Sequence, residues 1–237
     1  MPTRLQEKTG ATLYIALDVP DLLTAQNIIN DLGPHGYGIK LGLELCTAVG
    51  LPELLKHLDP QIPKFIDLKL NDIPNTVANT VRILSQMGAK IINLHASCGK
   101  KAMQAAANAK GNALLFAVTA LTSLTDYDCE CIYGATANKV VNRFAMMATD
   151  NGIDGIICSA QDLQTHDLPK TLMYLTPGIR PTWAATNDQA RITTPHDAIK
   201  LGADGIVIGR PITDPPHGLT RTEALNQILT EINLAQT

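Results

Sequence analysis

Eight short apolar runs recur along the chain, and this repetition limits the possible folds more than any other feature. Each run is almost continuously Ile, Leu, Val and other apolar residues, as a β-strand buried on both faces requires. The runs are residues 12–17, 38–43, 64–70, 91–95, 113–120, 153–159, 172–176 and 205–209. Polar or glycine residues follow each run, so we expect eight separate strands.

Stretches with helical periodicity lie between the runs. Residues 22–32, 73–87, 138–151 and 219–234 have apolar positions at helical spacing. In the second stretch we expect Asp72 to cap the helix and Pro74 to occupy its first turn. Alternation of strand and helix, repeated eight times, predicts an α/β protein of the (β/α)8 TIM-barrel class; a doubly wound open sheet is the alternative.

Length and composition are consistent with one globular domain. The 237 residues suit a single α/β barrel, and no linker, low-complexity segment or charge block divides them. We therefore expect a barrel domain over residues 11–237, preceded by a flexible segment, residues 1–10. The net charge of −3 offers no basic field for nucleic acid or an anionic membrane.

The cysteines and the amino-terminal residues indicate in which cellular compartment the protein is expected. Five cysteines occur at scattered positions without a Cys-x-x-Cys pair, which disfavours both a disulfide framework and a zinc site. Reduced thiols are typical of the cytoplasm. The first ten residues have no apolar signal region, and no apolar run approaches the roughly 20 residues of a membrane span. We expect a cytoplasmic protein.

Ionisable side chains gather where the predicted strands end, which is where (β/α)8 barrels carry their active sites. Asp18 ends the first strand, Lys40 lies in the second, and the third ends in Asp67-Leu-Lys69-Leu-Asn-Asp72. Asp67 and Lys69 are two residues apart, so they should point the same way from an extended strand. Charges in a barrel mouth are costly unless paired, and five of them indicate a catalytic array rather than structural ion pairs.

A phosphate site is expected at the end of the eighth strand. Gly209 and Arg210 would offer backbone N–H groups and a guanidinium to a phosphate dianion. The long connection 177–194 contains Arg180 and Gln189 and is typical of a lid that grips the same phosphate. The alternatives are an ordinary strand-to-helix turn and a surface insertion.

Taken in order, these motifs resemble the orotidine 5′-monophosphate decarboxylase family. They are Ala16-Leu17-Asp18, Ile39-Lys40-Leu-Gly, Asp67-x-Lys69-x-x-Asp72-Ile-Pro-Asn-Thr76, Leu121-Thr122-Ser, Thr176-Pro-Gly-Ile-Arg180-Pro and Gly209-Arg210-Pro-Ile. The resemblance covers nearly the whole chain and is to the short, stand-alone bacterial branch. It implies a homodimeric barrel that converts orotidine 5′-monophosphate (OMP) to UMP in pyrimidine biosynthesis, without cofactor or metal.

The resemblance also implies roles for the matching residues. Lys69 is implied to protonate carbon 6 of the pyrimidine, and Asp67 to lie beside the departing carboxylate. Lys40 and Asp72 complete the charge array, with Asp72 and Thr76 reaching in from the partner subunit. The implied substrate-binding residues are Asp18 and Lys40 for the ribose, Thr122 for the pyrimidine, and Arg180, Gln189, Gly209 and Arg210 for the phosphate.

Two other functions stay open. A metal-dependent sugar-phosphate decarboxylase or aldolase of the same superfamily shares the Asp-x-Lys-x-x-Asp frame but carries a glutamate for magnesium at the end of strand two, where this chain has Lys40. An inert nucleotide-binding barrel would be expected to lack Lys69 or Asp72, and both are present.

Overall fold

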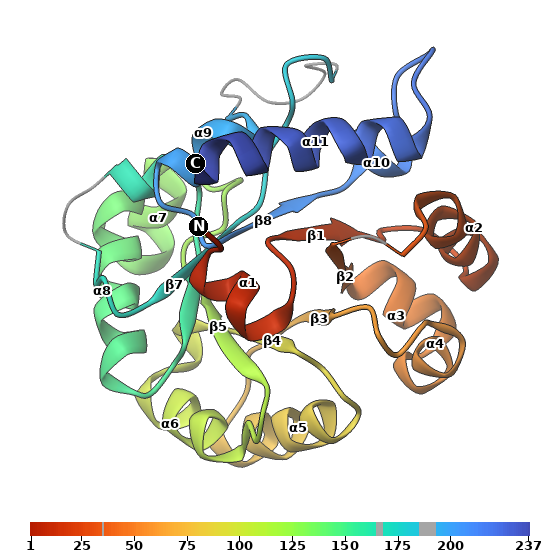
Figure 1. The fold of residues 1–237 in the computed structure, drawn as a ribbon. Helices are drawn as coiled ribbons and strands as arrows, with labels where there is room; N and C mark the ends of the chain where they lie inside the picture. The colour runs from red at the N-terminus through yellow and green to blue at the C-terminus, as the bar shows by residue number, and fades with distance from the viewer. Residues whose placement is uncertain (35, 165–167, 185–192) are drawn as a thin grey trace. The chain divides into compact units, whose positions relative to one another are not determined.

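The structure is a computed structural model that describes residues 1–34, 36–164, 168–184 and 193–237. Its eight strands form a closed parallel barrel in the order β1 to β8, with helices between them (Figure 1). Every predicted apolar run contains or overlaps one strand, so the predicted fold class is confirmed. The strands are β1 Leu13–Ala16, β2 Tyr37–Leu41, β3 Lys64–Leu70, β4 Ile91–His95, β5 Leu114–Val118, β6 Gly155–Ile157, β7 Met173–Thr176 and β8 Gly205–Ile208.

The chain divides into two compact units. The first contains residues 1–67 and 178–237, and the second contains residues 68–177. The division falls inside β3, so this strand begins in the first unit and ends in the second. A single barrel domain over residues 11–237 stays a prediction.

The first unit contains four neighbouring strand segments in the order β8, β1, β2 and β3. Ile15 of β1 pairs with Ile208 on one side and with Ile39 on the other, and Ile39 pairs with Lys64. Its helices are α1 Arg4–Thr9, α2 Leu22–Leu32, α3 Leu43–Val49, α4 Leu51–His57, α9 Pro195–Lys200, α10 Arg210–Thr213 and α11 Arg221–Gln236. The long helix α11 packs against α2, α9 and α10 (Figure 1).

Local sequence signals explain where the longer helices of the first unit begin. The Asp21 carboxylate accepts the Thr24 N–H at 2.7 Å and caps α2. Thr220 and Glu223 form a reciprocal capping box at the start of α11. Each cap satisfies backbone N–H groups that have no partner inside the helix.

The amino-terminal segment differs from the expectation of a flexible tail. Residues Arg4–Thr9 form α1, Thr3 caps it, and Leu5 is completely buried. The Arg4 guanidinium donates two hydrogen bonds to the Asp204 carboxylate, at 2.8 and 2.7 Å. The prediction rested on the short polar sequence, which could not reveal that a buried carboxylate 200 residues away holds this helix in place.

The second unit contains strands β4 to β7 and their helices. These are α5 Pro74–Gln86, α6 Lys100–Ala109, α7 Asp126–Tyr133 and α8 Ala137–Asp150, with short 3-10 turns η1 Ala96–Cys98 and η2 Asp162–Gln164. Pro74 occupies the first turn of α5 as predicted, but the cap residue is Ile73, without a side-chain cap. Asp72 is not the cap, because it lies one residue before the cap position. Its carboxylate accepts the N–H of Ile73, which lies before the first turn of the helix.

In each unit, an aromatic ring packs against a glycine of the neighbouring strand. In the first, Tyr14 of β1 lies against Gly38 of β2, its register partner. In the second, Phe116 of β5 lies against Gly155 of β6, again its register partner. Both rings are completely buried, so the missing side chains leave the room that the rings fill.

Candidate active site

The Lys40 ammonium lies between two carboxylates in the first unit. Its Nζ is 3.0 Å from Asp18 Oδ1 and 3.1 Å from Asp67 Oδ2. The side chains of Lys40 and Asp67 are only 11% and 9% exposed, whereas that of Asp18 is 52% exposed. Neighbouring parallel strands produce this arrangement, because β1, β2 and β3 end at the same edge. Three of the five predicted charged residues are therefore brought together.

Lys40 carries its positive charge in this setting. Burial by itself would lower the pKa of the Lys40 ammonium, since it removes the charge from water. The carboxylates of Asp67 and Asp18 outweigh that effect and raise the pKa above its ordinary value. The end of β2 thus presents a fixed cation flanked by anions.

Gly42 supports this cluster and was not among the predicted site residues. A Cβ at this position would lie 2.6 Å from Asp18 Oδ1 and 2.9 Å from Lys40 Nζ. The absent side chain therefore leaves room for the ion pair. The signal available in the sequence was a glycine two residues after a strand-end lysine.

Lys69 lies near the end of β3, in the second unit, and its backbone departs from the extended conformation. Its φ of 51° is the only positive φ among the described residues other than glycine. The expected side-chain alternation from Asp67 to Lys69 assumed extended backbone throughout and does not apply at this residue. Its backbone N–H donates to Asn93 Oδ1 at 2.8 Å. Asn93 was also not predicted, although it is the one amide in the apolar run of β4.

Three predicted residues of the second unit are exposed in the single chain. Asp72 and Thr76 lie at the start of α5, beside Ile73, which is 66% exposed. Thr122 follows the end of β5 and is also exposed. All three follow carboxyl ends of strands, as a barrel active site requires.

The proposed phosphate residues begin at the end of β8. Gly209 directly follows that strand, and Arg210 is the exposed first residue of α10. Because β8 pairs with β1, these residues lie at a strand end adjacent to the one that leads to Asp18. Arg180 is buried and its backbone N–H donates to the carbonyl of Thr193. Residues 185–192 of the predicted lid, Gln189 among them, lie outside the described residues.

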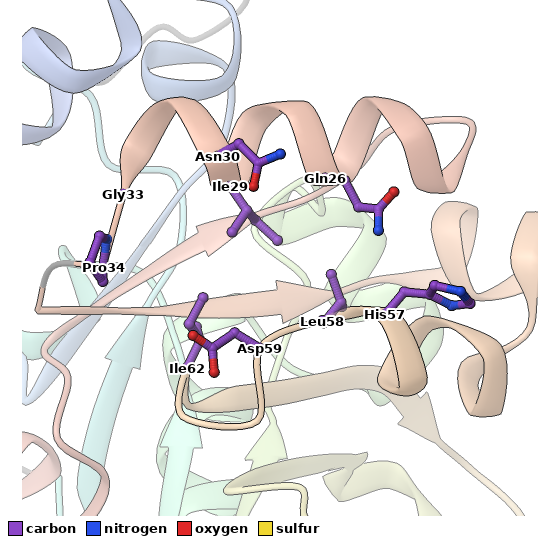
Figure 2. A pocket seen from close by; sticks show the side chains of 9 residues that line it. All are labelled: Gln26, Ile29, Asn30, Gly33, Pro34, His57, Leu58, Asp59 and Ile62. Atoms are coloured by element: carbon purple, nitrogen blue, oxygen red, sulfur yellow. The ribbon is translucent and has the colours of Figure 1, made fainter.

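A surface pocket of the first unit does not belong to this site. It measures about 470 Å³ and is lined by the end of α2, the end of α4 and the segment before β3 (Figure 2). Gln26, Asn30, His57 and Asp59 supply its polar side chains. Since the lining segments precede β2 and β3, the pocket lies toward the amino ends of the strands, and no predicted site residue lines it.

Among the residues that the structure describes, no group of three or more His, Cys, Asp or Glu side chains is arranged to hold a metal ion. Nor does any helix there combine the length and apolar character that crossing a membrane requires.

The closed (β/α)8 fold and the cluster of Lys40 with Asp18 and Asp67 at its strand ends place this protein in the class of barrel enzymes. The family model described as "Orotidine 5'-phosphate decarboxylase / HUMPS family" matches residues 11–224. The chain belongs to this family.

The family model covers two groups of proteins, whereas the similar proteins below are all named orotidine 5′-phosphate decarboxylases. The orotidine 5′-phosphate decarboxylase of Idiomarina loihiensis is 42% identical over 93% of this chain and 97% of its own length. That of Saccharophagus degradans is 39% identical over 93% and 94%. The crystal structure of the Lactobacillus acidophilus orotidine 5′-phosphate decarboxylase has a TM-score of 0.80 and 32% identity, and the match covers 94% of this chain and 99% of that one.

Proposed function

We propose that this protein decarboxylates OMP to UMP and carbon dioxide in pyrimidine biosynthesis. The observation that carries the proposal is the buried Lys40 ammonium, 3.1 Å from Asp67 and 3.0 Å from Asp18. The metal-dependent relatives are expected to place a carboxylate where Lys40 stands, and a cation there would repel a divalent metal. The full-length similarity to orotidine 5′-phosphate decarboxylases supports the same activity.

The chemistry requires a cation beside carbon 6. Breaking the bond from carbon 6 to the carboxylate leaves the electron pair on carbon 6, where the ring offers no adjacent carbonyl sink. The Lys69 ammonium stabilises that charge and then donates a proton to carbon 6, forming UMP and leaving a neutral lysine that regains a proton from water. Asp67 stands beside the departing carboxylate, and Lys40 holds Asp67 and Asp18 in place. The scheme uses no metal and no cofactor.

The remaining residues bind the nucleotide. Asp18 and Lys40 hold the ribose hydroxyls, and Thr122 hydrogen-bonds the pyrimidine. The phosphate is held by Arg180, Gln189, Gly209 and Arg210. A guanidinium pair and backbone N–H groups suit a dianion, and the energy of holding this remote group supports the chemical step.

The active unit is a homodimer in which Asp72 and Thr76 complete the partner's site. Their exposure in the single chain supports this assignment, as does the exposed apolar Ile73 between them. The protein acts in the cytoplasm on a small nucleotide, with no nucleic-acid or membrane partner. Its net charge of −3 is consistent with that setting.

The test follows the ultraviolet absorbance of OMP with purified protein in excess EDTA. We expect complete conversion to UMP, identified by chromatography. Lys69→Ala should lower turnover by at least about 100-fold, the contribution of a general acid. Its affinity for UMP, measured by calorimetry, should stay near that of the native protein.

Each alternative predicts a different result. Loss of activity in EDTA would identify a metal-dependent enzyme. Tight binding of UMP without any turnover of OMP would identify an inert nucleotide-binding barrel. Near-native turnover by the Lys69→Ala protein would remove Lys69 from the mechanism.

A further inference from the structure

The backbone of Lys69 adopts a conformation that side chains other than glycine rarely take. Its φ of 51° lies in the left-handed region, which costs an L-residue on the order of 1–2 kcal/mol. Such a conformation persists only where the surroundings hold it. The structure therefore has to provide a contact that compensates for this cost.

Asn93 provides that contact from the neighbouring strand β4. Its side-chain Oδ1 accepts the N–H of Lys69 at 2.8 Å, and the residue is completely buried. A buried amide is costly unless it is hydrogen-bonded, so an apolar residue would otherwise suit this place better. Both residues belong to the second unit, residues 68–177.

We propose that Asn93 is a positioning residue for Lys69. By fixing the left-handed backbone, it sets the direction in which the Cα–Cβ bond of Lys69 leaves the strand, and hence where the ammonium stands. An extended backbone at residue 69 would send the side chain elsewhere. The inference rests on the proposed role of Lys69 as proton donor, because positioning matters to rate only if this ammonium acts in the transition state.

The first test replaces the acceptor with an apolar group of similar size. Asn93→Leu should lower kcat for OMP by about 10- to 100-fold, as expected when a reacting group is misplaced by about 1 Å. KM for OMP and affinity for UMP should change by less than about threefold, since binding groups are untouched. Leu94→Ala is the matched control: Leu94 is also completely buried on β4, so its loss destabilises the barrel, yet kcat should stay near native.

A second variant keeps the proposal testable if the first does not fold. Asn93→Asp retains an oxygen acceptor at the same place and should keep kcat within about fivefold of native, a difference on the order of 1 kcal/mol. If Asn93→Asp loses as much kcat as Asn93→Leu, or if Leu94→Ala loses as much, the acceptor is not what matters and the proposal is wrong.

A readout independent of activity separates this proposal from the proposed function. A crystal structure of the Asn93→Leu protein should show residue 69 with a negative φ. A φ that stays in the left-handed region would overturn the proposal, whatever the activity. If the native protein fails to convert OMP while the φ of the variant changes as expected, the backbone role of Asn93 stands and the proposed function fails.

Discussion

The ring of Tyr14 fills the place that a side chain on Gly38 would occupy. A Cβ at position 38 would overlap Cε1 and Cδ1 of the Tyr14 ring. Tyr14 is completely buried and meets Phe65 edge-on, with ring centroids 6.1 Å apart. Packed interiors have little free volume, so the ring cannot simply move aside.

Gly38→Ala should therefore destabilise the fold. We expect the free energy of unfolding to fall by about 1–3 kcal/mol, the usual cost of overpacking a core. Urea denaturation measures it. In a Tyr14→Ala background the ring is gone, so the same substitution should cost less than in the native protein. Equal costs in the two backgrounds would show that the ring is not the obstacle.

Gly42→Ala should damage the site and spare the fold. The new methyl group would displace the Asp18 carboxylate or the Lys40 ammonium, both of which are ends of flexible side chains. If these groups hold the ribose, affinity for UMP should fall about tenfold, or roughly 1.4 kcal/mol, with little change in urea stability. Leu43→Ala, at the exposed next residue, is the control for calorimetry. Unchanged UMP affinity would contradict the assignment.

Arg210→Ala should discriminate between a nucleotide and its nucleoside. The lost guanidinium contact is to the phosphate, so kcat/KM for OMP should fall by about 10- to 100-fold. Turnover of orotidine, which lacks the phosphate, should hardly change. The comparison is Arg143→Ala, an exposed arginine on α8, which should alter neither. If both substrates suffer equally, Arg210 has a structural role instead.

Mixed dimers test whether Asp72 serves the partner. Lys69→Ala and Asp72→Ala proteins should each be nearly inactive alone. When they are unfolded and refolded together, about half the dimers are mixed, each with one intact site, so roughly a quarter of native activity should return. Light scattering confirms the dimers. The absence of recovery in confirmed dimers would place Asp72 in its own chain's site.

Cys131 should react with an alkylating agent before Cys46 and Cys98. Burial raises the pKa of Cys46 and of Cys98 to about 11. At pH 8 only about one thiol in a thousand is then the reactive thiolate, and the fraction rises tenfold per pH unit up to that pKa. Exposed Cys131 should be labelled first by iodoacetamide, as mass spectrometry can show. Equally fast labelling of Cys46 at pH 8 would contradict the shift.

At two places the structure differs from what the local sequence pattern indicates. The first ten residues lack apolar periodicity, yet the Arg4 guanidinium binds the Asp204 carboxylate and Leu5 is completely buried. Asp72 has the residue type of a helix cap, but the helix begins one residue later than that role needs. The cap prediction was wrong because residue type marks a possible cap but does not decide at which residue the helix begins.

The sequence by itself determined the eight strands, the barrel class and the kinds of residue at the strand ends. Strands buried on both faces need continuous apolar runs, and that requirement is visible within a few residues. Only the tertiary structure decided which of these residues contact one another. Lys40 meets Asp18 across 22 residues and Asn93 meets the backbone of Lys69 across 24, through pairing of neighbouring strands. The left-handed φ of Lys69 is likewise invisible in the sequence, because a residue normally avoids it and only its surroundings can impose it.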